Sequence, residues 1–293
     1  MKLRSTITLA LVCLLSFPLF SQSQIRPVRV EISKQYVRMG DTIRLDLHTT
    51  APIKSTDITL VKKTFEVFQT PKKPRSRYHY VAYMGVSRNL PSGKYKLRIK
   101  AQLKNNQRHK SIHTITVVHP KSKKKGKVKL NKQKQALSKD RKSLRKESRI
   151  IGQKFRTKTP LAYFEGAFIK PAKGRMSSAF GKERIYNSGI LRRHAGTDIA
   201  NKIGTPVYAP NNGRVILSTL FNVHGNTVMI DHGFGIVSIY NHLNERFVSE
   251  GQLIRKGDLI GRIGNTGLTS GPHLHWGLSL QNVRVDPLKW TKR

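Results

Sequence analysis

The apolar residues in the N-terminal third of the chain alternate with polar residues over short runs. Val28 to Ile32, Thr42 to Leu47 and Tyr95 to Ile99 follow this two-residue period, and Ile112 to Val118 forms a further short run. A period of two puts one side of a strand against a core and the other side in solvent. Residues 25–119 are therefore predicted to form a small antiparallel β-sandwich.

A different period governs residues 120–167. This segment, called the arm below, opens with a basic run from Lys121 to Lys127 that is either a solvated linker or a contact for an anionic polymer. Four apolar residues then recur every seven positions, and they are Leu130, Leu137, Leu144 and Ile151. On a helix they would form one narrow apolar stripe. The pattern predicts a basic helical arm that connects or braces two domains, and the high charge density leaves partial disorder open.

The sequence pattern changes again over residues 168–293, where glycine, proline and asparagine separate short apolar runs. Turn sequences of this kind are Gly204-Thr205-Pro206, Asn211-Asn212-Gly213 and His232-Gly233-Phe234-Gly235. Glycine takes backbone angles that other residues avoid, so these sites favour tight turns between strands. We expect an all-β, antiparallel C-terminal domain, which makes the chain mainly β.

The first 23 residues have the layout of a secretory signal peptide. A basic start at Lys2 and Arg4 precedes an almost wholly apolar stretch from Ile7 to Phe20, and small residues follow. We predict export to the periplasm or to the exterior, with no membrane span after removal of residues 1–23. Cys13, the only cysteine, lies inside this stretch. The mature chain would therefore have neither disulfides nor thiolate ligands, and any metal site must use His, Asp and Glu.

The charge balance points to a polyanionic partner. The chain has 56 Lys and Arg against 15 Asp and Glu, a formal net charge of +41. Such a charge opposes compaction by self-repulsion, and it attracts nucleic acid, anionic lipid or acidic wall polymers alike. Because no aromatic-interleaved recognition motif accompanies it, specific nucleic-acid binding is not expected.

Candidate chemistry gathers in three places of the C-terminal domain. These are His194 with Asp198, the run Tyr240-Asn241-His242, and His273-Leu274-His275. His273 and His275 would share one face of a strand, although a lone pair of this kind also fits two half-exposed strand histidines. Two imidazoles and a carboxylate are a common ligand set for catalytic zinc. The histidines beyond that set favour hydrolysis over a purely structural site, because hydrolysis needs groups that move protons.

These motifs, in this order, resemble the lysostaphin/LytM family of zinc peptidoglycan endopeptidases. The matching forms are His-x-Gly-x-Asp-Ile-Ala, Tyr-x-His-Leu and Gly-Asn-Thr-Gly-x-x-x-Gly-Pro-His-Leu-His-Trp, and the resemblance covers roughly Lys170 to Asp286. Three ordered motifs are far more specific than any one of them. The segment Leu-Pro-Ser-Gly-Lys-Tyr-Lys-Leu, at 90–97, resembles immunoglobulin-like bacterial modules, which says little about function.

The resemblance implies a set of roles. One zinc ion would be held by His194, Asp198 and His275, while His242 and His273 would stabilise the tetrahedral intermediate or relay its proton. Which of these two histidines is the base stays open. The implied activity is hydrolysis of peptidoglycan cross-links or stems by a zinc-activated water, with anionic cell-wall polymers as further partners. The alternative is a non-catalytic wall-binding or hydrolase-activator module, but such relatives lack part of the set and all five residues are present here.

Smaller expectations complete the picture. Arg192 and Arg193, just before the first ligand, are expected beside the metal, where they would receive an acidic peptide stem. Tyr240 and Asn187 are weaker candidates for substrate or ligand-supporting contacts. His224 and His232 are interpreted as structural. Autoinhibition, targeting and spacing remain open for the N-terminal domain, and one hypothesis is that it and the arm cover the zinc groove. Neither the bond cut nor the oligomeric state follows from the sequence.

Overall fold

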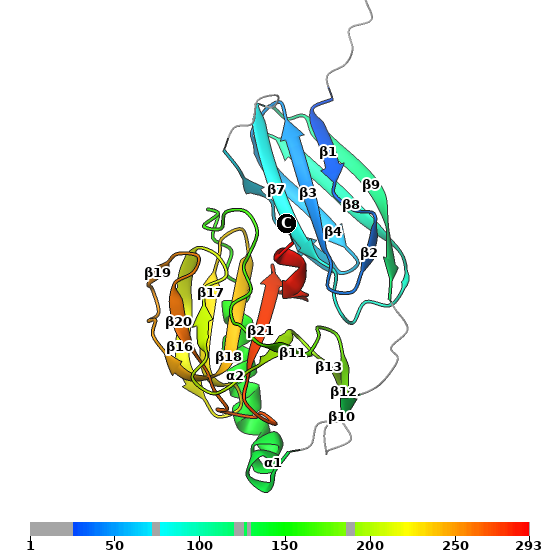
Figure 1. Ribbon diagram of the computed structural model, residues 1–293. Coiled ribbons are helices and arrows are strands. Elements are labelled where there is room, and N and C mark those ends of the chain that lie inside the picture. Colours follow the sequence, from blue (N-terminus) through cyan, green and yellow to red (C-terminus); the bar gives the residue numbers. More distant parts are fainter. Residues whose placement is uncertain (1–25, 72–76, 120–125, 128–129, 186–190, 293) are drawn as a thin grey trace, which may run out of the picture.

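The computed structural model describes residues 26–71, 77–119, 126–127, 130–185 and 191–292. The predicted signal peptide with Cys13, most of the basic run that opens the arm, and Asn187 lie outside these ranges. Within them, no helix is both long and apolar enough to cross a membrane. The mainly β prediction is confirmed: strands dominate both halves of the described chain (Figure 1).

The N-terminal part is a two-layer β-sandwich. One sheet has four strands, in the order β1 (Val28–Ile32), β3 (Thr42–Thr49), β7 (Tyr78–Gly85) and β6 (Phe68–Gln69). The other has five, in the order β2 (Tyr36–Arg38), β9 (Arg108–Val118), β8 (Gly93–Leu103), β4 (Ile53–Leu60) and β5 (Lys63–Phe65). All neighbours are antiparallel except β2 and β9.

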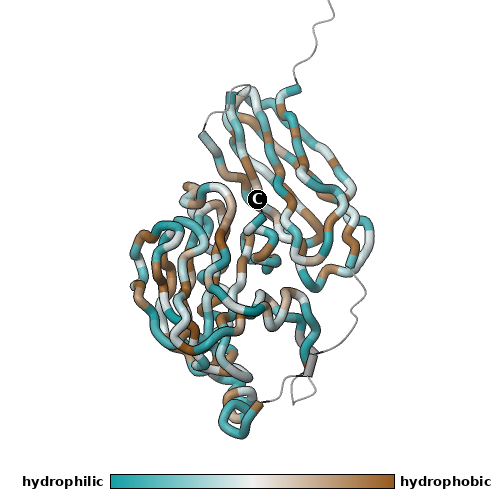
Figure 2. Tube along the Cα trace, in the orientation of Figure 1, coloured by the Kyte–Doolittle hydropathy of each residue, from teal (hydrophilic) through white to brown (hydrophobic). Residues whose placement is uncertain are grey.

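The alternation read from the sequence explains how these two sheets meet. Leu45 and Leu47 on β3 and Leu97 and Ile99 on β8 point inward and are fully buried in one apolar cluster. Figure 2 shows the corresponding alternation of polar and apolar positions along the strands. All four predicted runs lie in strands, and the immunoglobulin-like assignment of this sandwich stays a prediction.

The arm contains two helices, whereas the seven-residue stripe predicted one continuous helix. Helix α1 (Lys132–Lys139) and helix α2 (Arg141–Lys154) meet at Asp140, whose side chain accepts a hydrogen bond from the Ser143 N–H and so caps α2. Capping by Asp competes with helix continuation, which breaks the seven-residue stripe. Only its two ends, Leu130 and Ile151, are buried.

The C-terminal part is built on one large antiparallel sheet. Its main path runs β11 (Arg175–Ser178), β14 (Thr197–Ala200), β21 (His273–Leu280), β18 (Ile236–Arg246), β17 (Gly225–Asp231), β16 (Gly213–Phe221) and β19 (Leu253–Ile254). Three further strands attach to it, namely β15 (Pro206–Tyr208), β20 (Leu259–Ile263) and β22 (Val283–Val285). The central strands β21 and β18 carry three of the candidate histidines, namely His273 and His275 on β21 and His242 on β18.

A small three-stranded sheet lies beside the start of β14. It consists of β10 (Gly126–Lys127), β12 (Glu183–Ile185) and β13 (Leu191–Arg193). Strand β10 brings the basic segment after the sandwich alongside the hairpin that precedes the first candidate ligand. The β12–β13 hairpin is therefore paired with a strand of the arm.

The sandwich and the C-terminal sheet share an apolar cluster of their own. Phe68 of β6 stacks on Phe234 with ring centroids 5.1 Å apart, and both belong to a cluster that includes Tyr83 and Trp290. Trp290, at the end of the 3-10 helix η1 (Pro287–Trp290), donates its Nε1–H to Thr42 Oγ1 at 2.9 Å. These buried contacts join the two parts through a common core.

A second contact between the two parts lies near the candidate site. Gly181 has φ +75°, and a Cβ placed on it would lie 2.6 Å from Cε of Met39. Its N–H donates to the carbonyl of His194 at 2.9 Å. Glycine permits this backbone conformation and this close approach. The sandwich thus touches the loop that leads to His194.

Candidate metal centre

Two paired strands and the loop before them bring the predicted ligands together. Strands β14 and β21 run antiparallel with Asp198 directly opposite His275, and His194 lies in the loop that enters β14. Between the two first-motif residues, Gly196 passes so close to the Trp276 carbonyl that any Cβ would collide with it. The glycine in the His-x-Gly-x-Asp motif is therefore required by packing.

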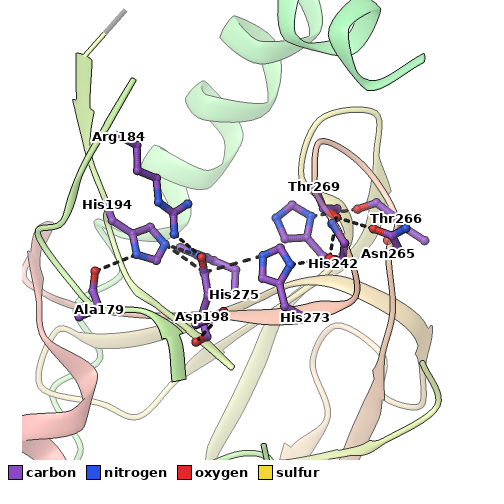
Figure 3. Close-up of polar contacts among 12 residues, drawn as sticks. Ala179, Arg184, His194, Asp198, His242, Asn265, Thr266, Thr269, His273 and His275 are labelled. Atoms are coloured by element: carbon purple, nitrogen blue, oxygen red, sulfur yellow. Dashed lines mark hydrogen bonds and ion pairs between the residues drawn. The ribbon is translucent and has the colours of Figure 1, made fainter. Parts of the chain in front are cut away.

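The three donor atoms converge on one point. Asp198 Oδ1 lies 3.0 Å from His194 Nε2 and 2.8 Å from His275 Nδ1, and the two ring nitrogens are 3.0 Å apart (Figure 3). Tetrahedral zinc with bonds of about 2.0–2.1 Å needs donors separated by about 3.3 Å. His194, Asp198 and His275 thus fit a zinc ion with little adjustment.

Backbone and burial set the ligands in their metal-binding forms. The Ala179 carbonyl, 3.1 Å from His194 Nδ1, can only accept, so Nδ1 carries the proton and Nε2 keeps its lone pair. Burial lowers the pKa of His275 to about 4, with Asp198 opposing the shift. Burial would raise the pKa of Asp198, but its polar contacts with His194 and His275 outweigh burial and hold that pKa far below its usual range. Near neutral pH the set is one carboxylate and at least one neutral imidazole.

His242 and His273 lie beside the ligands with their rings held alike. His273 Nδ1 donates to the Gly271 carbonyl at 2.8 Å, and His242 Nδ1 donates to the Thr266 carbonyl at 2.9 Å. Their ring centroids are 5.0 Å apart, and His273 Nε2 lies 3.8 Å from Asp198 Oδ1. When such a ring is neutral, its Nε2 therefore keeps the lone pair.

The position of His242 depends on a β-bulge. The register between β17 and β18 gains one residue on β18 between Tyr240 and Leu243, and His242 has φ +64°. A bulge re-aims the side chain it contains, and left-handed backbone costs about 1 kcal/mol for a residue other than glycine. Burial, followed by the nearby charges of His273 and His275, lowers the pKa of His242 well below its usual range. This ring is neutral at neutral pH and able to accept a proton.

An arginine that the sequence did not single out touches the centre. Arg184, on β12, pairs with Asp198 Oδ2, the carboxylate oxygen that faces away from the histidines. The expected arginine behaves differently: Arg193 donates to the Arg88 carbonyl at 2.7 Å and pairs with Glu183 at 3.2 Å. The Arg192 side chain lies outside the described residues. Arg193 lies opposite Glu183, one pair away from Arg184, so Arg184 and Arg193 point to opposite faces of the β12–β13 hairpin. The only sign of Arg184 in the sequence was the basic composition of this loop.

Tyr240, a weaker candidate, and His232, which was interpreted as structural, lie in the interior. Tyr240 is fully buried, and its hydroxyl donates to Ser238 Oγ at 2.8 Å. His232 is buried between the Asn212 carbonyl, 2.7 Å from Nδ1, and Ser238 Oγ, 2.8 Å from Nε2. His224 contacts Glu147 of α2. Neither Tyr240 nor His232 belongs to the converging set.

Comparison with known proteins identifies relatives of the C-terminal part. The model of peptidase family M23 matches residues 192–287. The peptidoglycan DD-endopeptidase ShyA of Vibrio cholerae is 39% identical over 121 residues, which are 40% of this chain and 28% of ShyA. The DD-carboxypeptidase/endopeptidase Mpg of Neisseria meningitidis serogroup B is 37% identical over 114 residues, or 39% of this chain and 26% of Mpg. The chain thus matches between a quarter and a third of the length of these curated relatives.

A solved structure extends the likeness to both parts of the molecule. A crystal structure from Pseudomonas aeruginosa, assigned to peptidase M23, superimposes with a TM-score of 0.64 at 25% identity. The superposition covers 88% of this chain and 95% of that one. Most of this chain therefore shares its fold with that protein.

Proposed function

Because residues 192–287 form a domain of peptidase family M23, we propose that this protein is a zinc-dependent endopeptidase that hydrolyses peptide cross-links or stems of peptidoglycan. One observation carries the proposal. Three donor atoms converge within hydrogen-bonding distance of one another, and the two further histidines beside them have Nδ1 tied to backbone carbonyls. A structural metal site would need only the first three.

We assign His194, Asp198 and His275 as the residues that would hold zinc. When bound, zinc supplies Lewis-acid polarisation of a carbonyl and lowers the pKa of water toward neutrality. Arg184 holds the second oxygen of Asp198 and so leaves Oδ1 for the ion. Asp198 would contribute the only negative charge among the three ligands, so bound Zn²⁺ would keep a net positive charge and act as an electrophile.

The two remaining histidines would handle protons. A neutral imidazole with a free Nε2 lone pair can accept the proton of an attacking water. Once protonated, the same nitrogen can donate to the departing amine, and its charge would stabilise a developing oxyanion. His242 and His273 are held alike by backbone carbonyls, so either suits the role of base while the other stabilises charge.

Location and partners follow from the remainder of the chain. The basic start and apolar stretch of residues 1–23 support export to the periplasm or exterior, where peptidoglycan lies. The net charge of +41 supports attraction to anionic wall polymers. We further propose three units in the mature chain, a sandwich over 25–119, an arm over 120–167 and a peptidase domain over 168–293.

The test is digestion of isolated sacculi by the purified full chain, loaded with zinc or stripped by a chelator. We expect muropeptides with newly formed amino and carboxyl termini only from the zinc-loaded protein. Their masses would also distinguish a D-Ala to diaminopimelate bond from an oligoglycine bridge. Zinc binding without any product would instead support the non-catalytic wall-binding alternative, and equal release in both samples would exclude zinc as the cofactor.

A further inference from the structure

A buried carboxylate on the arm holds a tight turn of the peptidase sheet. Glu147 of α2 is 3% exposed. Its Oε1 accepts from the Val223 N–H at 3.0 Å, while its Oε2 accepts from the His224 N–H at 3.1 Å and from His224 Nδ1 at 2.7 Å. Burial opposes ionisation, but these hydrogen bonds outweigh it and lower the pKa of Glu147. The ionised carboxylate of Glu147 thus bonds to the turn between β16 and β17.

That turn is one of two supports of His242. The His242 N–H donates to the His224 carbonyl at 3.1 Å, and its ring Nδ1 donates to the Thr266 carbonyl. The turn and the loop around Thr266 are themselves joined, because the Leu268 N–H donates to the Val223 carbonyl at 2.7 Å. A strained bulge residue needs such fixed partners, since its backbone would otherwise relax out of the left-handed region.

The other helix of the arm reaches the second support. Lys134 of α1 donates its ammonium to the carbonyl of Asn265 at 3.0 Å and to that of Gly267. These residues flank Thr266, the ring partner of His242. Each support of His242 is therefore held by one charged side chain of the arm, Glu147 at the turn and Lys134 at the loop.

We infer that the arm is a positioning element of the catalytic site, in which Glu147 fixes His242 through the carbonyl of His224. This inference rests on the proposed function for its meaning in catalysis, but its structural content concerns His242 alone. Glu147 touches neither the metal ligands nor any reacting group, so it is a positioning residue. The hypothesis of an arm that covers the groove makes the opposite prediction, because weakening the arm would then raise activity.

The alternative is that Glu147 only attaches α2 to the sheet. Apolar packing already does so, since Ile151 and Phe155 lie in a buried cluster with Met229 and Val237. Arg284 also lies over the Phe155 ring, 3.7 Å from its centroid. Attachment therefore does not need a buried charge, whereas control of two adjacent N–H groups and one imidazole does.

The test compares Glu147→Gln with wild type in the full, zinc-loaded chain. Glutamine has the same shape but replaces one acceptor oxygen by an NH2 group, so it cannot accept all the hydrogen bonds that Glu147 accepts from Val223 and His224. We expect kcat on a cross-linked muropeptide to fall about 10- to 100-fold, the usual range for residues that orient site groups, with KM and zinc affinity unchanged. The Nδ1–H signal of His242 in a proton–nitrogen spectrum, assigned by its loss in His242→Gln, should broaden or vanish.

Two variants complete the design. Lys134→Ala should act in the same direction through the loop around Thr266. Lys154→Ala, on the same helix as Glu147 but paired with the exposed Glu250, should match wild type in all measurements. A Glu147→Gln protein with wild-type kcat and an intact His242 signal would overturn the inference, as would loss of zinc affinity in step with kcat. If the wild type cleaves no peptidoglycan, the proposed function fails while the His242 signal still decides this inference.

Discussion

His273 and His275 stand two positions apart on one strand, and their side chains make different contacts. His275 places Nδ1 2.8 Å from Asp198 Oδ1, among the converging donors. His273 uses the same nitrogen to donate to the Gly271 carbonyl and keeps Nε2 free at 3.8 Å from Asp198. Alternation along a strand predicts that they share a face, but it does not reveal the Gly271 carbonyl, which holds the His273 ring outside the converging donors.

Substitution of these two histidines should separate metal binding from turnover. His275→Ala removes a ligand, so zinc affinity and activity should both be lost, with affinity falling by several orders of magnitude. His273→Ala leaves the three donors in place, so zinc should bind normally while kcat falls about 100- to 10,000-fold, the range for a general acid or base. Chelator competition and muropeptide release measure the two effects. Normal digestion of sacculi by His273→Ala would remove it from the catalytic assignment.

Acid should weaken the fold through His232. Burial lowers the pKa of His232 to about 4, whereas an unfolded histidine titrates near 6.5. Between pH 7 and 5 the unfolded state therefore takes up a proton that the folded state does not, and stability falls as pH falls. This histidine alone should contribute about 2 kcal/mol of loss over that interval.

The measurement is urea unfolding of wild type and His232→Gln at pH 7 and pH 5. The variant should be less stable than wild type at pH 7, because it disturbs the contacts with Asn212 and Ser238. Its further loss on acidification should nevertheless be smaller by about 2 kcal/mol. Parallel pH dependence in the two proteins would show that His232 is not the group responsible.

At the scale of single residues, the sequence motifs predicted the candidate site residues but not the residues that hold them in place. The sequence named His194, Asp198, His242, His273 and His275, and the structure brings these five into one place. Their roles stay predictions. Arg184 and Glu147 escaped notice because nothing local distinguishes them from other charged residues in a basic chain. Their contacts with Asp198 and His224 lie 14 and 77 residues away along the chain, and only the fold brings them together.

Secondary-structure elements were predicted best where periodicity is strong. The runs in β1, β3, β8 and β9 all appear as strands, since alternation records which side meets the core. The prediction of one continuous helix in the arm was wrong, because Asp140 caps α2 and ends the preceding helix. The seven-residue apolar stripe does not reveal this cap. The bulge at His242 has no sequence signature at all, because it depends on the partner strand.

The bulge region yields a prediction for Gly225, the first residue of β17. Gly225 has φ +67°, and a Cβ there would collide with Thr266, whose carbonyl holds the His242 ring. Gly225→Ala should therefore cost about 2–4 kcal/mol, from left-handed backbone plus overpacking, and should reduce kcat. Urea unfolding and muropeptide release would measure both losses.

Gly204→Ala is the matched control for this substitution. Gly204 also has a left-handed backbone, with φ +88°, but nothing lies within 4 Å of the position of its Cβ. It should cost only the backbone term of about 1 kcal/mol and leave kcat unchanged. Equal effects of the two substitutions would show that the contact with Thr266 is unimportant.

On the scale of the whole molecule, the shared apolar core should make the sandwich and the C-terminal sheet unfold as one cooperative unit. Trp290 is 1% exposed and packs with Tyr83, Phe164 and Phe168. Gln281 adds a pair of hydrogen bonds to the backbone of Glu66, at 2.8 and 2.9 Å. The sequence separated these parts by composition, but it gave no sign that they pack together, because interface residues look like ordinary core residues.

Trp290→Ala should uncouple the two parts. Removal of this side chain leaves a cavity and an unpaired Thr42 hydroxyl, so we expect a loss of about 3–5 kcal/mol. Scanning calorimetry should show one transition for wild type and two for the variant. Tyr36→Ala, which removes a side chain that is 79% exposed on the sandwich, should leave the single transition in place. A single transition in Trp290→Ala would mean that other contacts suffice.

The close packing of Met39 on Gly181 gives the molecule a mechanical property. The Gly181 N–H is bonded to the carbonyl of His194, and the neighbouring Gly40 carbonyl accepts from the Asp286 N–H at 3.0 Å. A displacement of the sandwich would therefore reach His194, the first residue of the candidate metal centre, through few contacts.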